Sequence, residues 1–260
     1  MKDILQEIVA TKRAEVDRRK RETDLQALYR QAETPHTVHS LREALLSSST
    51  GIISEFKRRS PSKGWINREA DVQRVVRAYQ QAGATALSVL TDTPYFGGTD
   101  DDLRAARQVC TLPILRKDFT IDEFQLVESR ALGADAVLLI AAALTREQCR
   151  RFAETAHQLE LEVLLEIHDQ SELDYYSEYV DILGVNNRNL GSFHTDVTNS
   201  FRLIEQMPQE ATPISESGIS NPDTVKKLRA IGFKGFLIGE NFMKTEAPGD
   251  SLKNFINALN

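Results

Sequence analysis

The chain has 260 residues, of which 41% are hydrophobic and 27% are charged, and its formal net charge is −6 at pH 7. A chain of this length can bury one large core, and its acidic balance argues against a nucleic-acid partner, which requires clustered basic side chains. No apolar run approaches the ~18 residues of a membrane span and the N-terminus lacks the apolar core of a signal peptide, so we expect a cytoplasmic protein that contacts neither nucleic acid nor membrane.

Residues 1–48 form an N-terminal extension with helical character. The first helix is amphipathic, because apolar residues at helical spacing are followed by alternating charges. The residues of its expected buried stripe are Ile4, Leu5, Ile8 and Val9. A second helix is predicted over 40–46, with Ser40 as its N-cap and Glu43 completing a capping box.

Eight short apolar runs follow, each of strand length and succeeded in turn by a segment with helical periodicity. They begin at Gly51, Ala86, Pro113, Ala136, Glu162, Ile182, Thr212 and Gly235. Repeated βα units predict an α/β fold with a parallel sheet, and eight units predict a (β/α)8 TIM barrel. We expect one domain over residues 1–260. The extension would belong to it, either packed on the barrel's exterior or bottom or placed as a lid over its active face.

Three of the connecting helices have clear limits in the sequence, at 69–82, 121–132 and 145–159. Gly83 and Gly133 follow the first two, as is typical where a helix turns into a strand. Cys110 and Cys149 both fall in predicted helical segments. We therefore expect two reduced, structurally ordinary thiols and no metal site.

Strand alternation predicts a polar cluster inside the barrel. Alternate side chains point into the interior, so Glu55 and Lys57 of the first run share the inward direction. The later runs add Lys117, Glu166, Asn186, Arg188 and Glu216. Because the carboxyl ends of barrel strands form the active face, we expect three acids and three bases to meet there. Ion pairs that only plug the barrel mouth are the alternative, but burying charges costs several kcal/mol per ion, which favours acid and base catalysis.

Glycines after the last two strands predict a phosphate site. Ser217 and Gly218 follow the seventh run, and Gly239 and Glu240 follow the eighth. These two loops commonly bind phosphate in such barrels, because glycine lets backbone N–H groups approach an anion. The loop after the first strand, which begins at Ser60, could add further donors.

The motifs at seven of the eight strands resemble those of indole-3-glycerol-phosphate synthase, in the order of that family. They are EFKRRSPS from Glu55, LTD from Leu90, YFGG from Tyr95, LRKDF from Leu115, LE from Leu165, GVNNRNL from Gly184, SESGI from Ser215 and FLIG from Phe236. The resemblance includes the helical extension and so covers essentially the whole chain.

The resemblance implies a lyase of tryptophan biosynthesis that needs no cofactor. Its reaction would convert 1-(2-carboxyphenylamino)-1-deoxyribulose 5-phosphate to indole-3-glycerol phosphate, CO₂ and water. By family analogy, Lys117 is the general acid of ring closure, and Glu166 with Lys57 serves the later proton transfers. Glu55 would orient and tune the lysines. How Glu166 and Lys57 divide the later transfers stays open.

The resemblance also implies how the substrate is held. Asn186 and Glu216 would position it, and Arg188 or Lys57 would bind its carboxylate. The expected apolar wall consists of Pro61, Phe96, Phe119 and Leu190, and the expected phosphate contacts are Ser60, Ser217, Gly218, Gly239 and Glu240. Glu240 stands where the family commonly has Ser, so we expect its backbone N–H to serve the phosphate and its carboxylate to point outward.

Two other functions fit the residues. One is an aldolase-type barrel acting on a sugar phosphate, in which Lys117 forms a Schiff base. The other is a non-catalytic barrel that binds a phosphorylated ligand, which would not need Lys117 and Glu166 together. For the synthase we expect a monomer whose partner is a small phosphorylated substrate, with weak association with other enzymes of the pathway.

Overall fold

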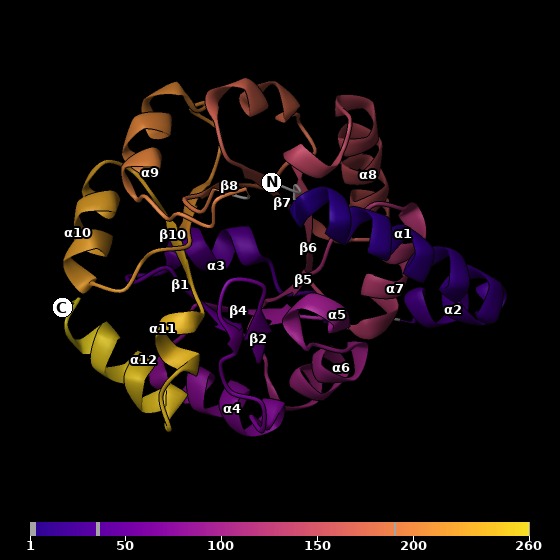
Figure 1. Ribbon diagram of the computed structural model, residues 1–260, viewed down its shortest axis with the longest axis horizontal. Helices are drawn as coiled ribbons and strands as arrows, with labels where there is room; N and C mark the ends of the chain where they lie inside the picture. Colours follow the sequence, from indigo (N-terminus) through magenta and orange to yellow (C-terminus); the bar gives the residue numbers. More distant parts are fainter. Residues whose placement is uncertain (1–3, 35–36, 190, 260) are drawn as a thin grey trace.

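The computed structural model describes residues 4–34, 37–189 and 191–259. At its centre, eight parallel strands close into a barrel in the order β1-β10-β9-β8-β7-β6-β5-β4 (Figure 1). The strands are β1 (Ile52–Phe56), β4 (Ala86–Leu90), β5 (Ile114–Lys117), β6 (Ala136–Ile140), β7 (Glu162–Ile167), β8 (Ile182–Asn186), β9 (Pro213–Glu216) and β10 (Gly235–Ile238). Each lies within one of the eight apolar runs, so the predicted TIM barrel is confirmed.

Helices surround the barrel and alternate with its strands (Figure 1). The α-helices after β1 are α4 (Val72–Ala82), α5 (Thr93–Phe96), α6 (Asp100–Val109), α7 (Glu123–Leu132), α8 (Arg146–Gln158), α9 (Thr198–Leu203), α10 (Pro222–Ala230), α11 (Glu240–Met243) and α12 (Pro248–Asn257). Short 3₁₀ helices are η1 (Ala141–Ala143), η2 (Gln170–Tyr175) and η3 (Ile204–Gln206). None of the helices in the described part of the chain combines the length and the hydrophobicity that a membrane span needs.

Capping side chains set the starts of the predicted helices. The α4 helix begins at Val72, three residues later than expected, because the Asp71 carboxylate accepts a hydrogen bond from the Arg74 N–H at 2.7 Å. Asp122 caps α7 in the same way. Gly83 ends α4 with a φ of +95°, a conformation that favours glycine. Cys149 lies in α8, whereas Cys110 lies directly after α6, and both thiols are free and buried.

Two apolar layers follow from strand alternation. Ile53, Leu115 and Leu164 belong to the layer inside the barrel, and their neighbours along the strands pack against the surrounding helices. The interior layer fills the lower part of the barrel. Polar side chains replace it at the carboxyl ends of the strands, where the predicted cluster lies.

The last helix of the extension closes the bottom of the barrel. Leu41 and Leu45 of α3 (Leu41–Ser47) are fully buried against the interior layer. The Ser40 hydroxyl caps α3 by accepting from the Glu43 N–H at 3.0 Å and donates to Glu162 at the start of β7. The Glu43 side chain pairs with Arg42 instead of completing the predicted capping box.

The first helix of the extension lies at the opposite end, over the active face. In Figure 1, α1 (Ile4–Glu22) crosses the barrel rim and leads into α2 (Leu25–Ala32). Its buried stripe includes Leu5 and Ile8 as predicted, but Ile4 and Val9 are only partly buried and Lys12 joins the stripe. The two alternatives left open by the sequence are therefore both realised, because α1 covers the top and α3 closes the bottom.

Candidate active site

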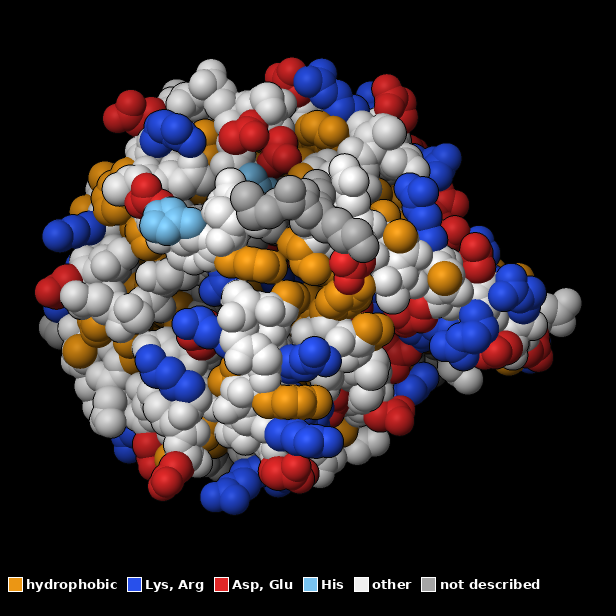
Figure 2. Space-filling model, in the orientation of Figure 1, with side chains coloured by type: hydrophobic (Ala, Val, Ile, Leu, Met, Phe, Trp, Pro, Cys, Tyr) orange, Lys and Arg blue, Asp and Glu red, His pale blue; other side chains and the backbone are white. Residues whose placement is uncertain are grey.

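A cavity of about 640 Å³ lies at the carboxyl ends of the barrel strands. The predicted site residues that line it are Glu55, Lys57, Pro61, Phe96, Lys117, Phe119, Glu166, Asn186, Arg188, Glu216, Ser217, Gly218, Gly239 and Glu240. Figure 2 shows this face, where hydrophobic side chains gather over the middle of the barrel with Lys and Arg beside them. Two short strands after β1, β2 (Arg59–Ser60) and β3 (Gly64–Trp65), pair antiparallel. Ser60 is buried there and does not line the cavity, and Leu190 lies outside the described residues.

Lys117 is the centre of the buried charge cluster. It ends β5, and its Nζ lies 2.6 Å from Glu216 Oε2 and 3.1 Å from Glu166 Oε2. Glu166 and Glu216 are 3% and 1% exposed. They meet Lys117 because all three occupy inward positions near the carboxyl ends of their strands.

The surroundings drive the pKa values of these groups apart. Burial alone would lower the pKa of Lys117, but the carboxylates of Glu216, Glu166 and Glu55 raise it well above its usual value. Burial raises the pKa of Glu216, and the neighbouring Glu166 carboxylate adds to this. Burial acts against ionisation of Glu166 as well, but Lys117 and His168 hold its pKa below the usual range. At neutral pH the site thus contains a protonated lysine beside one firmly ionised carboxylate.

Glu55 and Lys57 form a second ion pair at the first strand. Two glycines leave room for the carboxylates. A Cβ at Gly239 would collide with Glu55, and one at Gly184 would collide with Glu216. The backbone of β10 can therefore approach the Glu55 side chain closely, and any side chain at position 239 would displace it.

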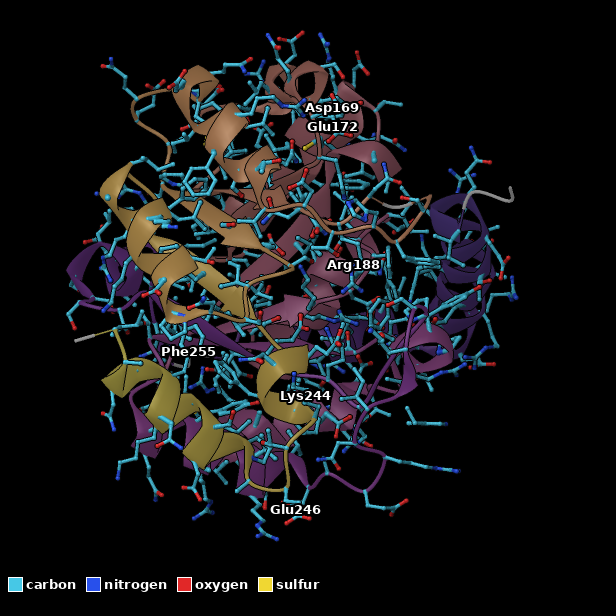
Figure 3. All side chains as sticks on the ribbon, turned by 60° about the vertical axis from the view of Figure 1, so that its left-hand side comes forward. Asp169, Glu172, Arg188, Lys244, Glu246 and Phe255 are labelled. Atoms are coloured by element: carbon cyan, nitrogen blue, oxygen red, sulfur yellow. The ribbon has the colours of Figure 1, made fainter. Side chains whose placement is uncertain are left out.

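Arg188 lies at the mouth of the cavity rather than among the buried charges. It follows β8 (Figure 3), and its guanidinium donates to the Ser62 hydroxyl at 3.0 Å. Glu240 was expected to point outward, but it lines the cavity, with its carboxylate 3.7 Å from Arg188 and 3.8 Å from Lys63. The reason is electrostatic, because these two cations attract the carboxylate across the cavity mouth.

The loops after β9 and β10 form the part of the cavity suited to an anion. Ser217 and Gly218 have φ values of +66° and +74°, which turns the chain sharply after β9. A Cβ at Gly218 would collide with Thr195, so glycine permits the close approach of two loops. Gly239 lines the cavity beside this turn. Backbone N–H groups in such glycine turns bind phosphate oxygens.

An apolar wall lies on the other side of the cavity. The rings of Phe96 and Phe119 are 6.1 Å apart between centroids, and Pro61 lines the same cavity. Helix α1 contributes Leu5 and Ile8 to the lining. The cavity can thus hold a flat apolar ring at one side and an anion at the other.

Three functional candidates were missed by the sequence analysis. Lys244 lines the cavity, and its position four residues after Glu240, on one side of the helix after β10, could have indicated this. His168 directly follows β7 and lies beside Glu166, and its only signal in the sequence was its place two residues after Glu166. Lys12 gave no signal, because a lysine among helix surface charges is ordinarily exposed.

The described residues contain no cluster of three or more His, Cys, Asp or Glu side chains that could hold a metal ion.

Comparison with known proteins assigns the family. Residues 5–255 match the family model of indole-3-glycerol phosphate synthase. The chain is 56% identical over 259 residues to the indole-3-glycerol phosphate synthase of Bacteroides thetaiotaomicron, with 100% of each chain covered. It is 42% identical to that of Acidithiobacillus ferrooxidans, with 98% of each covered.

Solved structures with low sequence identity share the fold. A tryptophan synthase α-subunit from Pyrococcus furiosus superposes with a TM-score of 0.60 at 14% identity, covering 81% of this chain and 97% of the other. A 3-hexulose-6-phosphate synthase from Salmonella typhimurium gives 0.62 at 12% identity, covering 81% and 100%. These similarities show the barrel alone. The family match and the full-length identities, together with the charged cavity, establish that this chain belongs to the indole-3-glycerol phosphate synthase family.

Proposed function

We propose how this member of the family divides its chemistry among the residues of the cavity. The family's enzymes are carboxy-lyases of tryptophan biosynthesis, which close the indole ring of a phosphorylated substrate with loss of CO₂ and water. The observation that carries the proposal is the contact of Lys117 with two buried carboxylates inside a cavity that has an aromatic wall and a glycine-lined anion site.

In ring closure, the ring carbon that carries the carboxylate attacks the substrate ketone. Lys117 donates a proton to the ketone oxygen as the new carbon–carbon bond forms. Its raised pKa keeps it protonated beforehand, and its contacts with Glu166 and Glu216 aim the ammonium group into the barrel. A protonated lysine is a poor nucleophile, which argues against the Schiff-base alternative.

The later steps require one acid and one base. Loss of CO₂ leaves its bonding electrons in the ring, and the hydroxyl then leaves as water after accepting a proton. Glu166 is the base that removes a proton from the newly closed ring, because it is the carboxylate held ionised. Lys57, paired with Glu55, is the proton donor to the leaving hydroxyl. Asn186 and Glu216 line the cavity beside these groups and position the substrate.

Phosphate and carboxylate would bind at separate places. Backbone groups of Ser217, Gly218 and Gly239 suit the phosphate, and Arg188 suits the substrate carboxylate at the cavity mouth. A carboxylate held too firmly as an anion would resist decarboxylation, so we expect Arg188 to neutralise the charge of the substrate carboxylate only in part. We expect Arg188→Ala to raise KM more than it lowers kcat. Unchanged KM and kcat in steady-state assays would remove this assignment.

The test of the general acid is turnover of the carboxyphenylamino substrate, followed by indole fluorescence. Lys117→Ala should lower kcat by about 10²- to 10⁴-fold, the usual contribution of a positioned acid. Lys20, an exposed lysine on α1, provides the control variant Lys20→Ala, which should retain full activity. Full turnover by Lys117→Ala would refute the role of Lys117 as proton donor.

We further propose that residues 1–260 act as one domain with 1–48 as an integral part, and that the enzyme is a cytoplasmic monomer. The contacts of α1 and α3 with both ends of the barrel support the first point, and two free buried thiols agree with a reducing compartment. Light scattering on the purified chain tests the monomer. A weak association with other pathway enzymes would be seen as a concentration-dependent change in mass when they are mixed.

A further inference from the structure

His168 lies behind the proposed base, between two carboxylates. Its Nε2 is 3.5 Å from Glu166 Oε1, and its Nδ1 is 3.5 Å from Glu172 Oε2. The imidazole is 14% exposed, and among the described residues neither ring nitrogen has a hydrogen-bond partner at closer range. Figure 3 shows Glu172 together with Asp169 on the segment that follows β7.

This arrangement favours a protonated ring. A neutral imidazole has one N–H donor and one lone pair, so it could serve one carboxylate but would turn a lone pair toward the other. An imidazolium donates from both nitrogens and suits both carboxylates. The position of the residue between Glu166 and Glu172 therefore favours the cationic form on geometric grounds.

The other groups around His168 act in the same direction. Burial alone would lower its pKa, but Glu172, Glu166 and Glu216 raise it above the usual value. Asp169, the next residue, is a further anion that interacts with His168. Asn199 on α9 donates only to the backbone carbonyl of His168, at 2.9 Å, and so leaves the ring free to serve the carboxylates.

The two carboxylates that contact Lys117 have different surroundings, because Asn186 and His168 act on Glu166, whereas Glu55 acts on Glu216. Glu166 has Lys117 at Oε2 and His168 at Oε1, so each oxygen faces a cation. Glu216 has Lys117 at Oε2, but its buried Oε1 has no hydrogen-bond partner among the described residues. A pair of acids in unequal surroundings separates into one that ionises first and one that holds its proton longer.

We propose that His168, as an imidazolium clamped between Glu166 and Glu172, is a positioning residue that makes Glu166 rather than Glu216 the ionised base. The inference rests on the proposed role of Glu166. His168 touches no reacting atom. It acts by fixing the orientation of the Glu166 carboxylate and by favouring its ionised form in the enzyme at neutral pH.

The test is the pH dependence of kcat for His168→Gln, which keeps a polar side chain but removes the charge. Without the cation, the pKa of Glu166 should rise by about one unit, so the acidic limb of the kcat profile should move to higher pH by that amount. At neutral pH, kcat should fall about tenfold or more because the base is less well oriented, while KM stays within about twofold of wild type. His157, a more exposed histidine that pairs with Asp181 on the helix layer, provides the control His157→Gln, which should leave the profile unchanged.

The Glu166→Gln background separates this inference from the proposed function. Glu166→Gln alone should abolish most turnover, and adding His168→Gln should then cause no further loss. If Glu166→Gln keeps full activity, the role of Glu166 fails. If Glu166→Gln loses most turnover but His168→Gln has a wild-type acidic limb, or lowers the remaining activity by the same factor in both backgrounds, the inference about His168 alone is overturned.

A measurement on the wild-type enzyme does not depend on how the variants fold. The imidazole of His168, followed by NMR through pH titration and assigned by its loss in His168→Gln or by sequential assignment, should lose its proton above the usual pH. Glu172→Gln should lower that titration point, because one of the flanking carboxylates is removed. Titration at or below the ordinary value in the wild type would contradict the proposal.

Discussion

Replacement of Lys12 by methionine should strongly destabilise this enzyme. Lys12 is 1% exposed, and its Nζ lies 2.9 Å from Asp92, 3.0 Å from Asp118 and 2.9 Å from Glu15. Asp92 and Asp118 are themselves buried. The substitution would leave Asp118 with only the more distant Arg116, at 3.7 Å, and would leave Asp92 without a cation at ion-pair distance among the described residues. Loss of one partner from a buried ion pair costs about 3–5 kcal/mol, and we expect a loss in the free energy of unfolding within that range.

The activity should fall as well, because both carboxylates hold parts of the cavity wall. Asp92 accepts from the Tyr95 N–H at 2.9 Å and so starts the short helix that carries Phe96. Asp118 accepts from the Phe119 N–H at 2.8 Å. Lys12→Met should therefore raise KM, since the aromatic wall and helix α1 would be held less firmly.

The destabilisation should depend on pH in a defined direction. Without Lys12, burial raises the folded-state pKa of the Asp92 carboxyl above its unfolded value, so the folded variant binds more protons than the unfolded chain as pH falls. The variant should consequently lose less stability at pH 5.5 than at pH 7.5. Urea unfolding followed by circular dichroism at both pH values measures this.

Arg18→Met on the same helix is the matched control. Arg18 pairs with Glu22 at 2.9 Å, but the two side chains are 58% and 60% exposed. Such an exposed pair contributes about 0.3–0.5 kcal/mol. If Lys12→Met cost no more than Arg18→Met, or cost more at the lower pH, the argument from buried charge would be refuted.

Two further substitutions test the cavity itself. Glu240→Ser should lower KM for the phosphorylated substrate about fivefold, because it removes from the cavity mouth a negative charge that repels the substrate by about 1 kcal/mol. Glu246→Ser, farther out along the same segment (Figure 3), should leave KM unchanged. A raised KM in Glu240→Ser would contradict this prediction. Gly239→Ala should lower stability by about 1–3 kcal/mol and lower kcat, because the new methyl group collides with Glu55 although the backbone φ of −121° is ordinary. Gly191→Ala controls for the loss of a glycine, because its methyl group would meet only an ordinary contact at 3.5 Å. If both alanine variants unfolded at the same urea concentration, the collision with Glu55 would cost nothing and the prediction would be wrong.

Much of the barrel and its charged interior could be predicted from local sequence. Strand periodicity of two placed Glu55, Lys117, Glu166 and Glu216 on the inward side, and eight repeats placed them at one end of a barrel. The structure brings these four side chains into one cavity. Alternation along a strand is a property of the backbone, so it needs no knowledge of distant contacts.

Other features depended on which segments meet in space. The sequence left the place of the extension open, since an amphipathic stripe specifies that a helix is buried but not against what; only the fold puts α1 over the cavity and α3 under the barrel. Glu240 turned inward because Lys63 and Arg188, distant in the chain, lie across the cavity mouth. The burial of Lys12 likewise required Asp92 and Asp118 to converge from the segments that follow two different strands, β4 and β5. Local periodicity thus determined which side chains face the interior, whereas long-range electrostatics, which acts between segments brought together only by folding, decided the partners and orientation of each charge.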